Sequence, residues 1–182
     1  MCIRDRCALA RILIEKGITV SGSDVSDSAV LQELRNKGAA VFIGHKRENI
    51  NNADVLVVSS AIGIDNPELQ EAKSRDLPIF HRSDVLAAIF KWGKGIAVAG
   101  AHGKSTTSAM IGQIFHVAKM DPTIVLGGFT DYLKGNSCLG HGEHIIAEAD
   151  ESDGSFLKFA TFLSVVTNIA VSYTHLRAHE TV

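Results

Sequence analysis

A glycine-rich segment at the centre of the chain carries residue types that bind phosphate groups. It consists of Gly100, Ala101, His102, Gly103, Lys104, Ser105 and Thr106. An apolar stretch, IAVAG, leads into it and a helical pattern follows, so backbone N–H groups would converge where strand becomes helix. Lys104 would add an ammonium group for the β- and γ-phosphates, and the Ser105 hydroxyl would bind Mg²⁺. These residues predict a site for ATP and Mg²⁺.

This segment is a variant of the strict phosphate-loop motif, because Val98 stands where that motif has a further glycine. The alternative interpretation is an ordinary glycine-rich turn followed by a chance Lys-Ser pair. We favour the phosphate loop because the strand, the turn, the Lys-Ser pair and the helix pattern coincide.

An acidic segment, EADESD, follows the apolar stretch HIIA and begins at Glu148. Carboxylates at the carboxyl edge of a parallel strand beside a phosphate loop are placed to hold the metal of a nucleotide. Because Mg²⁺ usually takes only one or two protein carboxylates, we choose Glu148 first and Glu151 second. The alternative is a solvated acidic turn.

Polar residues also end two earlier predicted strands. Asp24 ends the first, where an acid commonly accepts ribose hydroxyls, although no glycine fingerprint lies upstream and the residue could simply cap a helix. Ser60 follows the second, and a plain polar turn is its alternative. His141 and His144 lie three apart, but no further ligand set accompanies them, so an exposed loop is favoured over a metal site.

Helical and strand patterns alternate along much of the chain, which predicts an α/β fold with parallel strands. We expect a Rossmann-like domain over residues 1–93 and a partial phosphate-loop domain over residues 94–182. The apolar stretch Asp54–Ser59 is expected to be a strand buried on both faces, and residues 135–142 a glycine- and asparagine-rich loop. Residues 1–7 and 170–182 do not continue the pattern, and we expect them to be foreign to this fold.

The composition excludes several functional classes. The 182 residues include 46% hydrophobic and 21% charged side chains with a formal net charge of -2, so no basic surplus exists to bind nucleic acid or an anionic membrane. No apolar run reaches the roughly 18 residues that span a bilayer. Three cysteines without a CxxC pair, and no secretory signal, predict a cytoplasmic protein.

Taken together, the motifs resemble those of the Mur ligase family over residues Ala8 to Ile169. The family's phosphate loop matches residues 100–106 except that Ala101 replaces threonine. Further matches, in order, are SGSD, IGH, SSAI, NPEL, DPT, EADESD and TNI.

The resemblance implies an ATP-dependent ligase that joins L-alanine to the carboxylate of UDP-N-acetylmuramate through an acyl phosphate, in the synthesis of bacterial peptidoglycan precursors. It implies that Lys104 contacts phosphates, that Ser105 and Glu148 hold Mg²⁺, and that Asp24, His45 and Ser60 lie near the UDP-sugar. Related alternatives are a ligase that attaches a preformed murein peptide and a non-catalytic nucleotide-binding module. A phosphate-loop NTPase that hydrolyses ATP to drive motion is a further alternative.

Two departures from the family bear on activity. The glycine-rich loop expected before Ala8 is missing with its strand, which is central in such a sheet, so the first domain is expected to be incompletely closed. After Ile169 the sequence diverges from the family. We therefore expect the chain as given to lack ligase activity.

Overall fold

The computed structural model describes residues 2–149 and 155–169, and helices and strands alternate through its first half as the sequence predicts. The first half contains, in order, α1 (Cys2–Glu15), β1 (Ser21–Asp24), α2 (Ala29–Asn36), β2 (Ala40–Ile43), η1 (Arg47–Ile50), β3 (Leu56–Val58), α3 (Pro67–Ser74), β4 (Ile79–His81) and α4 (Arg82–Phe90). The second half contains β5 (Lys94–Ala99), α5 (Lys104–Val117), β6 (Thr123–Thr130), β7 (Gly135–Cys138), β8 (His144–Glu148), η2 (Ser155–Lys158) and β9 (Leu163–Val166).

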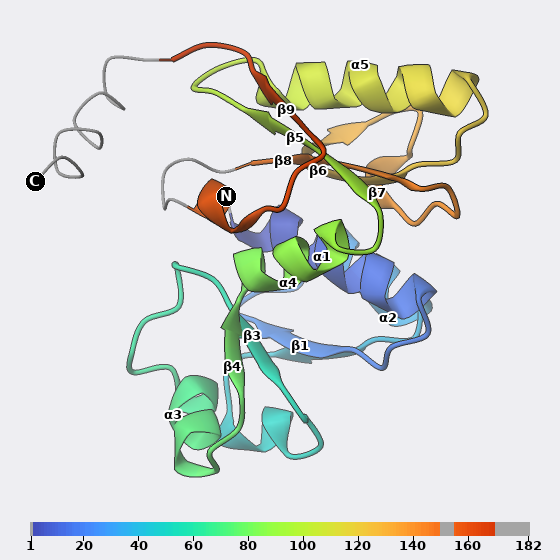
Figure 1. The fold of residues 1–182 in the computed structure, drawn as a ribbon. Helices are drawn as coiled ribbons and strands as arrows, with labels where there is room; N and C mark the ends of the chain where they lie inside the picture. Colours follow the sequence, from blue (N-terminus) through green and yellow to red (C-terminus); the bar gives the residue numbers. More distant parts are fainter. Residues whose placement is uncertain (1, 150–154, 170–182) are drawn as a thin grey trace, which may run out of the picture.

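The strands of the second half form one sheet in the order β7-β6-β8-β5-β9 (Figure 1). The pairs β5–β8, β5–β9 and β6–β8 are parallel, which confirms the predicted α/β class. The strand β7 is antiparallel to β6. The expectation of a loop over residues 135–142 is therefore wrong at its start, because a turn after Thr130 lets this segment fold back and pair with β6 despite its glycine and asparagine content.

Helices cover both faces of this sheet, as Figure 1 shows: α5 lies on one side and α1 and α4 on the other. Neighbouring residues of a strand point to opposite faces. Ala97 of β5 accordingly packs with Ile12 of α1 and Phe90 of α4. Its neighbour Ile96 belongs to the core on the other face, where Phe115 of α5 lies. The largest core thus joins helices of the first half to strands of the second.

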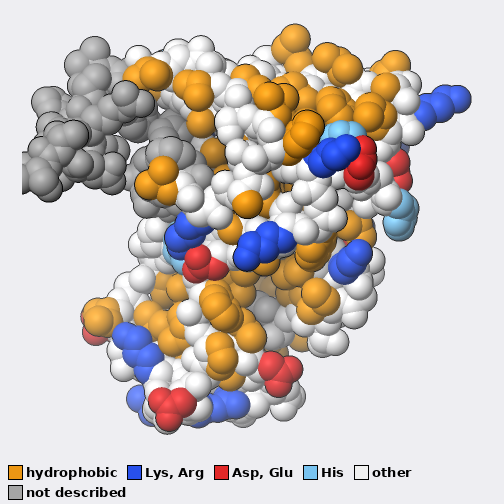
Figure 2. Space-filling model, viewed as in Figure 1, with side chains coloured by type: hydrophobic (Ala, Val, Ile, Leu, Met, Phe, Trp, Pro, Cys, Tyr) orange, Lys and Arg blue, Asp and Glu red, His pale blue; other side chains and the backbone are white. Residues whose placement is uncertain are grey.

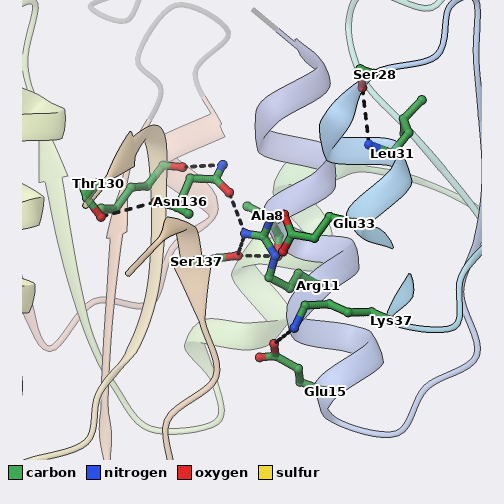
Figure 3. A network of polar contacts seen from close by, with 12 residues as sticks. Ala8, Arg11, Glu15, Ser28, Leu31, Glu33, Lys37, Thr130, Asn136 and Ser137 are labelled. Carbon is green, nitrogen blue, oxygen red and sulfur yellow. Dashed lines mark hydrogen bonds and ion pairs between the residues drawn. The ribbon is translucent and has the colours of Figure 1, made fainter. Parts of the chain in front are cut away.

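A buried arginine strengthens this junction (Figure 3). Arg11 of α1 is 5% exposed, and its Nη1 donates to Oδ1 of Asn136 at 3.0 Å and to Oγ of Ser137 at 3.2 Å, both in β7. Its Nη2 donates to Oε2 of Glu33 in α2 at 2.8 Å. One side chain therefore ties α1 to α2 on one side and to the sheet on the other.

The strands of the first half form two separate parallel pairs, β1–β2 and β3–β4. The apolar segment around β3 was predicted to be buried on both faces, and this prediction is wrong. Val55 and Val57 are 44% and 36% exposed, whereas the intervening Leu56 is only partly exposed, so neighbouring structure covers one face of this small sheet. Hydrophobic side chains accordingly show on the surface over β3 and β4 (Figure 2).

Parallel pairing brings the carboxyl ends of β5 and β8 to the same edge of the five-stranded sheet, where Val98 is the register partner of Glu148. This is the edge at which open α/β sheets bind ligands. Within residues 2–149 and 155–169, no helix is long and apolar enough to cross a membrane.

Candidate nucleotide-binding site

The segment between β5 and α5 forms a tight loop, as the sequence predicted. Gly100, Ala101, His102 and Gly103 make the loop, and Lys104, Ser105 and Thr106 make the first helical turn. Gly103 is the N-cap of α5 with φ +82°, a conformation that favours glycine, and no side chain caps the helix there. The first N–H groups of a helix have no partner within it, so this end presents donors and a positive dipole.

Lys104 folds back over the loop. Its Nζ donates to the carbonyl oxygen of Gly100 at 2.7 Å, and the side chain is partly buried. The ammonium group therefore lies beside the same turn whose backbone N–H groups begin α5. A lysine held there supplies positive charge to an anion bound at the helix end.

The hydroxyl of Ser105 and the carboxylate of Glu148 meet at the edge of this loop. Ser105 Oγ donates to Glu148 Oε2 at 2.9 Å, and the backbone N–H of Gly127 in β6 donates to Glu148 Oε1 at 2.7 Å. The second contact orients the carboxylate toward the loop, and both residues are solvent-accessible at the site. Structure thus brings together two residues that lie 43 positions apart in the chain.

This pair fits a magnesium ion by its chemistry. Mg²⁺ prefers oxygen ligands and usually takes one or two from the protein, the others coming from phosphate and water. The serine hydroxyl and one carboxylate provide such a set. No group of three His, Cys, Asp or Glu that could hold a metal by itself occurs in the described part of the chain. The second predicted carboxylate, Glu151, lies outside the described residues.

Two residues after β9 hold the loop in place, and the sequence reasoning did not single them out as site residues. Thr167 Oγ1 donates to the carbonyl oxygen of His102 at 2.6 Å. Asn168 Nδ2 donates to the same oxygen at 2.7 Å, and its Oδ1 accepts from the His102 N–H at 3.1 Å. Two signals were available: their position directly after an apolar strand that would end at the same sheet edge, and the TNI match to the family.

A second polar cluster lies at the carboxyl ends of β1 and β2, and it includes His45. Ser23 Oγ donates to Glu68 Oε2 at 2.7 Å and lies 2.8 Å from Nδ1 of His45. Asn49 Nδ2 donates to Glu68 Oε1 at 2.7 Å. Glu68, at the start of α3, is 8% exposed, and sequence reasoning missed it because its partners are 45 and 19 positions away.

The three residues predicted near a UDP-sugar are only partly brought together. Asp24 ends β1, and His45 lies two residues after the end of the paired strand β2. Asp24 Oδ2 lies 3.6 Å from Nη2 of Arg6. Ser60 follows β3 on the other pair of strands, where its Oγ lies 3.1 Å from Nε2 of His81. Each pair of strands thus ends in a serine–histidine contact.

The histidines at 141 and 144 do not form a metal site with their surroundings. His144 is 8% exposed and packs edge-on against Phe115, with ring centroids 4.9 Å apart. Glu143, between them, pairs with Lys94 at 3.0 Å. His144 is a core residue, whereas a loop had been expected, and His141 is exposed.

Comparison with known proteins agrees with the fold. Residues 4–92 match the family described as "Mur ligase family, catalytic domain". The chain is 49% identical over 161 residues to the "UDP-N-acetylmuramate--L-alanine ligase" of Aquifex aeolicus, covering 88% of this chain and 36% of that protein. It is also 49% identical over 162 residues to the protein of the same name from Dictyoglomus turgidum, covering 89% and 35%.

Solved structures give the same result. The UDP-N-acetylmuramate-alanine ligase of Thermotoga maritima superposes with a TM-score of 0.86 at 28% identity, over 95% of this chain and 41% of that one. A UDP-N-acetylmuramate:L-alanyl-gamma-D-glutamyl-meso-diaminopimelate ligase from Neisseria meningitides has the same fold, with a TM-score of 0.86 at 22% identity, over 92% of this chain and 58% of that one. The chain spans 36% and 35% of the two curated relatives named above. Its sequence and its fold together make it a member of the Mur ligase family.

Proposed function

We propose that this chain is the nucleotide-binding part of an ATP-dependent ligase that joins L-alanine to UDP-N-acetylmuramate. Residues 94–182 would bind ATP with Mg²⁺, and residues 1–93 would bind the UDP-sugar. The relatives that are 46–49% identical are named for this reaction, which favours L-alanine over a preformed peptide as the amino partner.

The reaction needs activation because hydroxide is a poor leaving group from a carboxylate. An oxygen of the UDP-sugar carboxylate attacks the γ-phosphorus of ATP, the bond to the β,γ-bridging oxygen breaks, and ADP leaves. The amine of L-alanine then attacks the acyl carbon of the resulting acyl phosphate. Inorganic phosphate leaves, the amine loses a proton, and an amide bond has formed.

The residues of the loop would stabilise the charge that moves in the first step. Lys104 and the backbone N–H groups at the start of α5 would hold the β- and γ-phosphates. Ser105 and Glu148 would hold Mg²⁺, with Glu151 as a further candidate, and a bound Mg²⁺ would neutralise phosphate charge. Asp24, His45 and Ser60 would contact the UDP-sugar. No nucleic acid or membrane is needed for this chemistry.

One observation carries the proposal: a lysine ammonium group, a helix N-terminus and a serine–carboxylate pair lie around a single turn, with Ser105 Oγ 2.9 Å from Glu148. The direct test is binding of MgATP to the purified 182-residue chain by titration calorimetry. Lys104→Ala should weaken binding at least about tenfold, because a charge-assisted contact is worth about 1.5–3 kcal/mol.

Lys94→Ala is the matched control, since Lys94 lies at the other end of β5 and pairs with Glu143. The Lys94→Ala variant should leave MgATP affinity unchanged. Lys94→Ala and Lys104→Ala should both unfold at nearly the same urea concentration as the unsubstituted chain. Equal affinity of the Lys104→Ala variant and the unsubstituted chain would refute the phosphate role. In a full-length enzyme carrying this segment, ADP release that requires L-alanine would distinguish the ligase from an NTPase, which turns over ATP without an amino acid.

A further inference from the structure

Glu68 ends a chain of hydrogen bonds that determines which nitrogen of His45 carries a proton. Ser23 Oγ donates to Glu68 Oε2 at 2.7 Å and lies 2.8 Å from His45 Nδ1. A serine hydroxyl has one hydrogen, and here the carboxylate accepts it. The contact with His45 must therefore run the other way, with Nδ1–H donating to Ser23 Oγ. In the neutral imidazole, Nε2 is then the acceptor.

The surroundings hold this arrangement rigidly. Asn49 Nδ2 donates both to the carbonyl oxygen of Gly44 at 3.0 Å and to Glu68 Oε1 at 2.7 Å. The carbonyl can only accept, so the amide nitrogen of Asn49 must face Gly44 and Glu68. Both carboxylate oxygens thus accept from donors of fixed orientation. Gly44, with φ +82°, makes the turn that presents His45 beside them.

The position of His45 suits it for contact with a ligand. Its side chain is 21% exposed, and within the described residues its Nε2 has no hydrogen-bond partner. It follows β2, at the carboxyl edge where Asp24 ends the adjacent strand. An acceptor nitrogen in this place would receive an N–H or O–H donor of a bound molecule.

We propose that Glu68 is a positioning residue: through Ser23 it holds His45 as the Nδ1–H tautomer, so that Nε2 accepts a hydrogen bond from the UDP-sugar. The identity of the ligand rests on the proposed function, whereas the tautomer does not. Glu68 acts through His45 and touches no ligand itself. This assigns a role to a buried acid in the NPEL segment that the loop chemistry does not use.

The substitution Glu68→Gln tests the direction of the chain. The Asn49 donor would select the amide oxygen of Gln, which turns the amide nitrogen toward Ser23. The nitrogen would donate to Ser23 Oγ, the serine hydroxyl would donate to His45 Nδ1, and the ring proton would move to Nε2. A single change from acceptor to donor at residue 68 therefore reverses both the bond to Ser23 and the bond between Ser23 and His45.

The measurement is ¹⁵N–¹H correlation NMR of the imidazole nitrogens at mildly alkaline pH. His45 should show the Nδ1–H pattern in the unsubstituted chain and the Nε2–H pattern in Glu68→Gln. Glu71→Gln is the matched control, because it makes the same change one turn along α3, and it should leave the His45 signals unchanged. Ser23→Thr, which keeps the hydroxyl, should retain the Nδ1–H pattern.

An Nε2–H or averaged pattern in the unsubstituted chain would overturn the proposal, and so would an unchanged pattern in Glu68→Gln. The first of these outcomes decides the question even if Glu68→Gln does not fold. Calorimetry with UDP-N-acetylmuramate tests the contact with the ligand. Glu68→Gln should weaken binding of the UDP-sugar about tenfold, because one hydrogen bond of about 1.4 kcal/mol is lost. Unweakened binding by a tautomer-switched variant would overturn the ligand contact. Failure of the unsubstituted chain to bind the UDP-sugar would count against the proposed function and leave the tautomer result standing.

Discussion

The substitution Gly100→Ala tests whether the loop depends on close packing against the segment after β9. A Cβ on residue 100 would lie 2.2 Å from Oγ1 of Thr167 and 3.0 Å or less from two backbone atoms of Asn168. Gly100 also has φ +130°, a backbone conformation that residues with a side chain rarely adopt. The added methyl group must therefore displace the two residues that bond to His102.

The expected cost has two parts. Forcing a non-glycine residue into this backbone conformation costs about 1–3 kcal/mol. Inserting a methyl group into a packed contact costs about 1–3 kcal/mol more, because the atoms it meets at Asn168 belong to the backbone and cannot rotate away. The free energy of unfolding should therefore fall by about 2–6 kcal/mol, the lower value applying if the loop shifts as a whole. MgATP affinity should fall as well, since the loop loses its shape.

Urea unfolding followed by far-UV circular dichroism measures the first effect, and titration calorimetry the second. Gly128→Ala is the control, because Gly128 lies in β6 and no heavy atom lies within 4 Å of its added Cβ. It should change the free energy of unfolding by less than about 1 kcal/mol. A Gly100→Ala variant as stable as the control, with unchanged MgATP affinity, would show that contacts with Thr167 and Asn168 do not shape the loop.

Three further predictions concern other parts of the molecule. Glu148→Gln should raise the Mg²⁺ concentration needed for half-maximal ATP binding more than Glu151→Gln does, and the reverse order would mean that the carboxylate nearer the strand is not the main ligand. Arg11→Ala should lower the free energy of unfolding by about 2–3 kcal/mol in urea titrations, because a charged donor is lost to buried Asn136 and Ser137; a change below 1 kcal/mol would contradict a structural role for this contact. Burial raises the pKa of Cys138 to about 11, so its thiol stays protonated at pH 8 and iodoacetamide should alkylate it about 100-fold more slowly than in the urea-unfolded chain. Peptide mass spectrometry measures these alkylation rates, and equal rates would show that the thiol is accessible in the fold.

Local patterns in the sequence were sufficient to predict the tight turn between β5 and α5. The apolar strand before Gly100, the glycine at 103 and the helical periodicity after it are all features of adjacent residues. The position of Glu148 followed from the same logic, since parallel strands that alternate with helices end at one edge. The structure confirms the α/β class and brings Ser105 and Glu148 within hydrogen-bond distance.

Features that depend on distant residues were not predictable in this way. The bonds from Asn168 to His102 and from Ser23 to Glu68 join positions 66 and 45 residues apart. The exposure of Val57 had the same origin: an apolar run indicates burial only if other elements cover it, and β3 pairs with β4 alone among the described strands.

The cap of α4 shows a smaller error of this kind. Serine is a common capping residue, so the sequence predicts Ser83 as the cap of this helix. The ring of His81 instead accepts from the Ser83 N–H, while Asp84 accepts from the His81 N–H. Histidine is not among the usual capping residues. Ser83 is instead 1% exposed and bonds to the same ring at 2.7 Å, so it belongs to the core.

The division of the first half into two short strand pairs has a consequence for where the fold opens locally. Each pair is held by few backbone hydrogen bonds, whereas the five-stranded sheet has helices on both faces. Amide protons of β1 to β4 should exchange with deuterium through local opening, well before those of β5 and β8, which exchange only when the whole core opens. During such openings the separated strands of each pair offer additional unpaired backbone donors and acceptors to another molecule, so self-association should increase with the frequency of opening rather than with global unfolding.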